Sequence, residues 1–191
     1  MLQQNSKIKH ASILNNAKVK NFGIPSKKTC FGAKYCLPYC YVGKGLYNFP
    51  NVQASLQNNW DRTKTDDFIT DMYDELVSSA VTHQRIHDSG DFYSKEYLDK
   101  WLWVASALPH VTFYAYTKSI PLFINRTLPD NFIVVFSYGG KYDSLIDPNI
   151  HRHSKIFKTA KELKKARYHD ASVDDLQAIN LKNHKIGLIY H

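Results

Sequence analysis

Helical and strand-like segments alternate between residues 65 and 137, and this order constrains the fold more than any other feature of the sequence. Apolar residues recur at helical spacing in 65–80 and 94–108. Short runs rich in β-branched and aromatic residues, which are typical of strands, occupy 81–87, 111–117 and 132–137. Strands that alternate with helices favour a parallel sheet joined by right-handed crossovers. The sequence therefore predicts an α/β fold, a partial (β/α) barrel with a mostly parallel sheet.

Local signals set the expected ends of these elements. Thr65 is the expected N-cap of the first helix, and Pro109 marks the end of the second. The run from Phe132 to Phe136 is almost entirely apolar, as in a strand that is buried on both faces. The segment 120–128, between the last two of these strands, is expected to be helical.

The remainder of the chain is expected to belong to the same domain. Two further strands are predicted in 154–160 and 185–191, with a helix near 173–181 between them. The sequence contains no internal repeat and no low-complexity linker. We therefore expect one domain over residues 1–191, in which a basic, cysteine-bearing segment (1–50) precedes a β/α core (51–191).

Polar residues follow the predicted strands, at the positions where each strand ends. In parallel β/α folds, reactive groups collect at the carboxyl edge of the sheet. A carboxylate at this edge can hold an ammonium group or act as a base, although an aspartate there can also simply cap the following turn. The candidate cofactor-binding residues are Asp88, Ser89, Gly90 and Asp91 after one strand, and Thr117 and Lys118 after the next.

The three cysteines of the chain, Cys30, Cys36 and Cys40, lie within eleven residues in a C-x5-C-x3-C pattern. An odd and clustered set is unlike the even, dispersed cysteines of a secreted disulfide framework. The pattern instead predicts a metal site, with a [4Fe-4S] cluster that leaves one iron open as the first interpretation. Two alternatives remain: a zinc ion completed by a distant histidine such as His87, and three unliganded thiols.

The formal charge of +8 is distributed unevenly along the chain. Residues 1–50 contain eight lysines and no acidic residue, whereas Lys and Arg balance Asp and Glu over the rest of the chain. Within that remainder, residues 151–191 are again basic. Basic surfaces attract anions, so the N-terminal segment predicts a face that binds nucleic acid or a host protein. A solvated lysine-rich face without a partner is the competing interpretation.

Two stretches of the sequence carry a resemblance to a known family. The segments "TCFGAKYCLPYCY" and "HDSGDFYSKEYLDKWLWVASALPHVTFYAYTKS" resemble the phage-encoded gene product 88 domain, which in turn is similar to radical S-adenosylmethionine (SAM) enzymes. The most specific shared parts are the three cysteines with Tyr41, the turn from Ser89 to Phe92, and the strand end from Tyr116 to Ser119. The usual cysteine spacing of radical SAM enzymes is C-x3-C-x2-C, which differs from the spacing here.

The resemblance implies a radical-SAM-like partial barrel with a [4Fe-4S] cluster in the loop after its first strand, and a phage origin. It also implies that SAM binds the open iron. If the chain is an enzyme, Asp91 or Asp88 would hold the amino group of SAM. The sequence identifies no catalytic residues, so a radical SAM-type enzyme remains one hypothesis. A non-enzymatic cluster protein or a zinc protein, binding nucleic acid or a host protein through the basic face, is the alternative. Without an apolar membrane-spanning stretch or leader, we expect a cytoplasmic location in the host cell.

Overall fold

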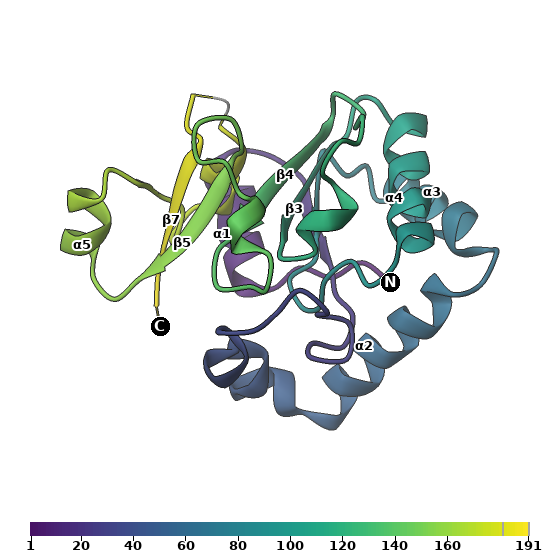
Figure 1. Cartoon of the computed structure of the whole chain (residues 1–191). Coiled ribbons are helices and arrows are strands. Elements are labelled where there is room, and N and C mark those ends of the chain that lie inside the picture. The colour runs from purple at the N-terminus through teal and green to yellow at the C-terminus, as the bar shows by residue number, and fades with distance from the viewer. Residues whose placement is uncertain (181, 191) are drawn as a thin grey trace.

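The computed structural model describes residues 1–180 and 182–190, and within them seven strands form one parallel sheet (Figure 1). The strands are β1 (Val19–Phe22), β2 (His83–Ile86), β3 (Thr112–Thr117), β4 (Phe132–Ser137), β5 (His153–Phe157), β6 (His169–Asp170) and β7 (Lys185–Ile189). Their order across the sheet is β1-β2-β3-β4-β5-β7-β6. Leu181 and His191, which end the helix expected near 173–181 and the strand expected in 185–191, lie outside the described residues.

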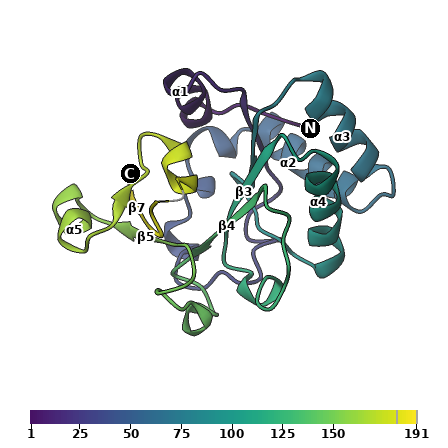
Figure 2. The same ribbon diagram turned by 90° about the horizontal axis from the view of Figure 1, so that it is seen from above.

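All neighbouring strands of the sheet run parallel. β3 pairs with β4 over five residues, whereas β4 meets β5 only through Phe136 opposite His153 and Ser137 opposite Ser154. The right-handed twist of the strands accumulates across the sheet, which curls into a half-barrel, as the view from above shows (Figure 2). The predicted α/β fold with a partial (β/α) barrel is therefore confirmed.

The helices within the described residues are α1 (Ser6–Leu14), α2 (Pro50–Thr63), α3 (Phe68–Ser78), α4 (Lys95–Ala107) and α5 (Ala160–Lys165). α3 and α4 lie side by side on one face of the sheet (Figures 1 and 2). α5 lies at the far end of the sheet, beside β6 and β7. In this part of the chain, none of the helices is long and apolar enough to cross a lipid bilayer.

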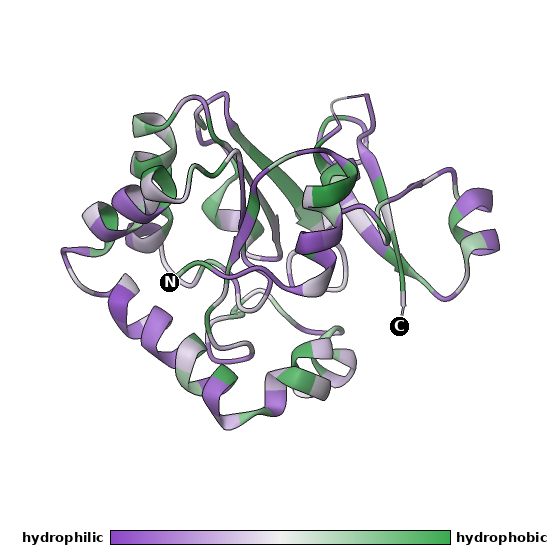
Figure 3. Cartoon of the chain, turned by 180° about the vertical axis from the view of Figure 1, so that it is seen from behind, coloured by the Kyte–Doolittle hydropathy of each residue, from purple (hydrophilic) through white to green (hydrophobic). Residues whose placement is uncertain are grey.

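The largest apolar cluster joins α3 and α4 to the outer face of the half-barrel. The rings of Phe22 on β1 and Phe68 on α3 both meet the ring of Trp101 on α4, at centroid distances of 5.3 and 5.5 Å. All three side chains are fully buried, and burying each contributes about 1.5–3 kcal/mol. Figure 3 shows the contrast between these apolar elements and the largely hydrophilic α2.

The inner face of the sheet is covered by α1 and by the 3-10 turn η6 (Asp175–Ile179). Ile8 and Ala11 of α1 pack here with Val19 of β1 and Tyr114 of β3. The central strands are thus covered on both faces. This explains why the sequence of β4 is apolar nearly throughout.

Three sequence-based expectations about helices are corrected by the structure. The segment 120–128 forms only a 3-10 turn, η4 (Ile120–Leu122), because Asn125 adopts the left-handed conformation and ends helical continuation. The helix α3 begins after Asp67 rather than after Thr65. In the third case, the segment near 173–181 forms the 3-10 turn η6 and not an α-helix.

Candidate functional site

The three cysteines lie in the loop of residues 23–49, which follows β1 and crosses the carboxyl edge of the sheet. Ala33 forms an isolated bridge with Gly140, just beyond the end of β4. On the other side, the hydroxyl of Tyr41 donates to the carbonyl of Asp88, just beyond the end of β2. The loop is therefore fixed to the ends of two strands, and the cysteines follow the first strand of the sheet as expected.

Two glycines allow this loop to approach the strand ends closely. A Cβ on Gly32 would lie 2.0 Å from the carbonyl oxygen of Lys118, so only glycine lets the cysteine loop rest on the end of β3. Gly90 has a φ of +87°, and a Cβ there would lie 2.4 Å from Cγ1 of Ile24. The Ser89-Gly90-Asp91 turn therefore needs its glycine both for conformation and for contact with the loop.

All three cysteines are free and partly buried. Cys36 and Cys40 flank the 3-10 turn η1 (Leu37–Tyr39), which places them on one short stretch of backbone. Burial, followed by the charge of Asp91 and smaller effects of Cys40 and Cys36, raises the pKa of the Cys30 thiol to about 12. Among the residues that the structure describes, no three His, Cys, Asp or Glu side chains are grouped so as to hold a metal ion.

Asp91 connects the ends of β2 and β3. Its Oδ1 accepts hydrogen bonds from the Thr117 hydroxyl at 2.6 Å and the Phe92 amide at 2.8 Å. Its Oδ2 accepts one from the Lys118 amide at 2.8 Å. Burial raises the pKa of Asp91, and these donors partly offset that effect. Both carboxylate oxygens are therefore engaged in hydrogen bonds that link the turn after β2 to the end of β3.

The other predicted cofactor-binding residues surround this connection. The hydroxyl of Ser89 donates to the carbonyl of Ile24 at 2.8 Å, which ties the turn to the cysteine loop. The ammonium of Lys118 donates to the hydroxyl of Ser137 at 2.8 Å, across the ends of β3 and β4. The structure thus brings the predicted polar residues together at one edge of the sheet, largely through bonds to one another.

Asp88 lies on the side of the turn that faces the N-terminal segment. Its Oδ2 accepts hydrogen bonds from the Tyr47 hydroxyl at 2.9 Å and the Asn5 amide group at 3.1 Å. Its Oδ1 is buried without a hydrogen-bond partner. This oxygen lies against Gly23, where an added Cβ would come within 2.5 Å of it. Asp88 therefore links the end of β2 to the cysteine loop and to the N-terminal segment.

His87 belongs to the aromatic core and is not placed as a ligand beside the thiols. Its Nε2 shares a hydrogen bond of 2.6 Å with the Tyr97 hydroxyl, and its ring meets that of Phe92 at 4.8 Å. Burial and the charge of Arg85 lower its pKa to about 3. The imidazole is therefore neutral and structural.

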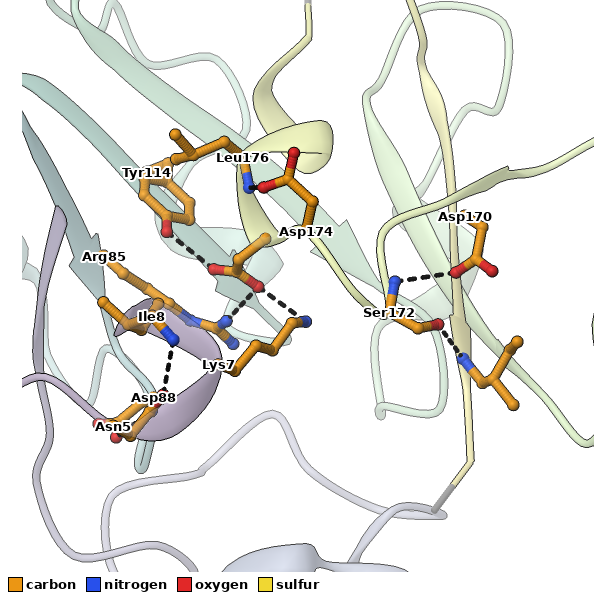
Figure 4. Close-up of polar contacts among 12 residues, drawn as sticks. Asn5, Lys7, Ile8, Arg85, Asp88, Tyr114, Asp170, Ser172, Asp174 and Leu176 are labelled. Atoms are coloured by element: carbon orange, nitrogen blue, oxygen red, sulfur yellow. Dashed lines mark hydrogen bonds and ion pairs between the residues drawn. The ribbon is translucent and has the colours of Figure 1, made fainter. Parts of the chain in front are cut away.

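A buried ionic network inside the half-barrel escapes prediction from the sequence (Figure 4). The carboxylate of Asp175 on η6 meets Arg85 of β2 at 2.5 Å and Lys7 of α1 at 2.9 Å. It also accepts a hydrogen bond from the hydroxyl of Tyr114 on β3 at 2.8 Å. Burial alone would raise the pKa of Asp175, but Arg85 and Lys7 outweigh it and hold the pKa at about 2.

Comparisons with known proteins point to one phage family. The family model described as "Gene product 88" matches residues 1–191. The chain is similar to the Gene 88 protein of Mycobacterium phage L5, with 30% identity over 61% of this chain and 56% of that protein. The Gene 88 protein of Mycobacterium phage D29 is 30% identical over 51% of this chain and 47% of its own length. The alignments thus span about half of each relative, and no solved structure matches.

Proposed function

This chain belongs to the phage gene product 88 family, and from that premise we propose that it is an iron–sulfur protein whose cluster is held by Cys30, Cys36 and Cys40. One observation carries the proposal. Three free thiols are presented by a single loop that is anchored over the carboxyl edge of a parallel half-barrel. This is the edge at which β/α folds place their reactive groups.

The donor set suits a cluster better than a single zinc ion. Tetrahedral zinc with Zn–S bonds of about 2.3 Å would gather its sulfur ligands to within about 3.8 Å of one another. A structural zinc site takes four such ligands, whereas the loop supplies three thiols and His87 is buried in the aromatic core. Each cysteine of a cubane cluster binds a different iron, so the thiolates need not converge on one point.

The charges of the loop also support an anionic cluster. Lys27, Lys28, Lys34 and Lys44 are exposed on the cysteine loop, and their positive charge offsets that of thiolates and sulfides. The thiol of Cys30, whose pKa is about 12, is protonated at neutral pH. Coordination must therefore displace its proton, and cluster binding should strengthen as the pH rises.

SAM binding stays a prediction of the resemblance to radical SAM enzymes. Neither candidate carboxylate presents an exposed, unpartnered oxygen to a ligand amino group, because Oδ1 of Asp88 has no hydrogen-bond partner but is buried. Both oxygens of Asp91 accept hydrogen bonds from Thr117, Phe92 and Lys118, and Oδ1 of Asp88 lies against Gly23. We therefore derive no SAM-dependent step from these residues, and the function proposed is cluster binding alone.

Metal analysis of the anaerobically purified protein tests this proposal. We expect a brown protein that contains iron and acid-labile sulfide in equal amounts, and a variant with Cys30, Cys36 and Cys40 changed to serine that contains neither. The serine variant must unfold at a similar denaturant concentration, so that loss of iron reports ligation and not misfolding. A colourless wild-type protein that contains zinc, or a serine variant that retains its iron, would refute the proposal.

The same preparation tests the SAM prediction separately. SAM is added to the reduced protein, and the electron paramagnetic resonance spectrum is recorded before and after. Binding at an open iron would change the spectrum, whereas an unchanged spectrum would contradict SAM binding and leave the cluster proposal intact.

A further inference from the structure

A groove with a volume of about 740 Å³ lies between α5 and the amino-terminal ends of β6 and β7. Four cationic side chains line it: Lys164, Arg167, Lys182 and Lys185. All four are exposed. The groove therefore lies at the amino-terminal edge of these strands, whereas the cysteines occupy the carboxyl edge of the sheet.

The positive charge of this groove is largely uncompensated. Over residues 1–180 and 182–190, none of its four cations takes part in an ion pair. One acidic side chain lines the groove, that of Asp170, and its Oδ1 accepts a hydrogen bond from the amide of Ser172 at 2.8 Å. A concave surface lined by one sign of charge focuses the field and attracts anions.

The walls of the groove are held in place by the fold. Arg152 donates from one guanidinium nitrogen to the carbonyls of Ala178, Asn180 and Asn183, at 3.0, 3.0 and 2.5 Å, which holds Asn183 in the wall of the groove. On the opposite wall, Leu163 of α5 packs closely on Gly187 of β7. A Cβ added to Gly187 would lie 2.5 Å from Cδ1 of Leu163. The cations are therefore presented on a preformed surface, which lowers the entropic cost of binding.

We propose that this groove binds the phosphodiester backbone of single-stranded nucleic acid. Its volume is in the range of small-ligand pockets, about 300–1,000 Å³, so it has room for a short stretch of a flexible strand. A positively charged groove that follows the backbone is the usual way to bind single strands without sequence preference. The site is distinct from the lysines of residues 1–50 and does not depend on a cluster.

Fluorescence anisotropy with a labelled DNA strand of about 20 nucleotides, longer than a usual single-strand site of about 4–16, tests the proposal. The groove variant changes Lys164, Arg167, Lys182 and Lys185 to glutamine. The control variant removes the same charge outside both the groove and the cysteine loop, at Lys9, Lys18, Lys20 and Lys141, which are exposed or half-buried and make no ion pair in the described chain. Thermal unfolding of both variants confirms that they fold.

The salt dependence gives the expected magnitude. If four phosphates are neutralised, with a slope of about −0.7 each for a single strand, the wild-type affinity falls about 50-fold between 50 and 200 mM salt. We expect the control variant to keep most of this affinity, and the groove variant to lose most of it together with its salt dependence.

Several results would overturn the proposal. If the wild-type protein binds no strand at 50 mM salt, the proposal is wrong. If both variants lose the same affinity, the effect is one of net charge alone and the groove is not the site. Loss in the control variant only would place the site outside the groove. Tighter binding of the matching duplex, or equal competition by a polyglutamate peptide or a mononucleotide, would each contradict recognition of a single-stranded backbone.

Discussion

Replacing Asp175 with asparagine tests whether the buried ionic network holds the two ends of the chain on the half-barrel. The carboxylate is fully buried and pairs with Arg85, whose side chain is 12% exposed, and with Lys7, whose side chain is 32% exposed. The substitution keeps the shape of the side chain and removes its charge. Lys7 can then turn to solvent, whereas Arg85 loses its carboxylate partner and remains largely buried.

Two routes give a similar magnitude for the loss. The pKa of Asp175 falls from 3.8 to about 2 in the folded protein, which corresponds to a stabilisation on the order of 2 kcal/mol at neutral pH. Breaking a buried ion pair by removing one partner costs about 3–5 kcal/mol. Because one of the two cations can regain water, we expect a loss of about 3 kcal/mol.

Urea unfolding of the wild type and of D175N at pH 7 measures this loss directly. The matched control is D66N, at an exposed aspartate, which should change stability by less than about 0.5 kcal/mol. Since the folded pKa of Asp175 is depressed, its contribution is complete above about pH 4 and disappears as the pH falls through about 2. A loss below about 1 kcal/mol, or a difference between wild type and D175N that grows toward pH 2, would refute the reasoning.

Three further predictions concern the cysteine edge of the sheet. Gly90→Ala should destabilise the protein by more than about 2 kcal/mol in urea unfolding, because the new methyl group meets Ile24 and φ is +87°. Thr117→Val removes a buried donor to Asp91 and should cost about 1.5–3 kcal/mol in the same assay; an unchanged midpoint would contradict either prediction. The third prediction uses a metal-free variant in which Cys36 and Cys40 are changed to serine, so that Cys30 is the remaining thiol. At pH 8, iodoacetamide should alkylate Cys30 at least about 100-fold more slowly than a model thiol, because the pKa of Cys30 is about 12. That rate should rise about tenfold per pH unit, and a rate equal to that of the model thiol would show that Cys30 is not buried as described.

The parts of the fold that the sequence predicted are those with long periodic signals. α4 has its N-cap at Ser94 and buries Leu98 and Trp101 on the expected stripe, and β4 is covered on both faces as its apolar run implies. The elements that escaped prediction are short or polar. β6 has two residues and α5 has six, which is too few for a period to be recognised. α2 buries only three of its fourteen residues, so it has little apolar pattern to detect.

The candidate site was predictable in its composition but not in its bonding. The rule that polar groups gather at the carboxyl ends of parallel strands correctly placed Asp91, Thr117 and Lys118 together. The sequence could not show that Asp91 is engaged by its neighbours rather than free. The pairing of Arg85 with Asp175 was also out of reach, because it joins residues ninety positions apart. An inward-facing arginine on a buried strand was the one available signal that an acidic partner exists.

Mössbauer spectroscopy of the anaerobic protein, loaded with a Mössbauer-active iron isotope, tests cluster binding by the three cysteines most directly. Three thiolates on a cubane leave one iron with a different ligand, so we predict two subspectra, one from three similar irons and one from a single distinct iron. Both subspectra should disappear when Cys30, Cys36 and Cys40 are replaced by serine. Iron in a single mononuclear environment, or a spectrum that survives these substitutions, would contradict the account.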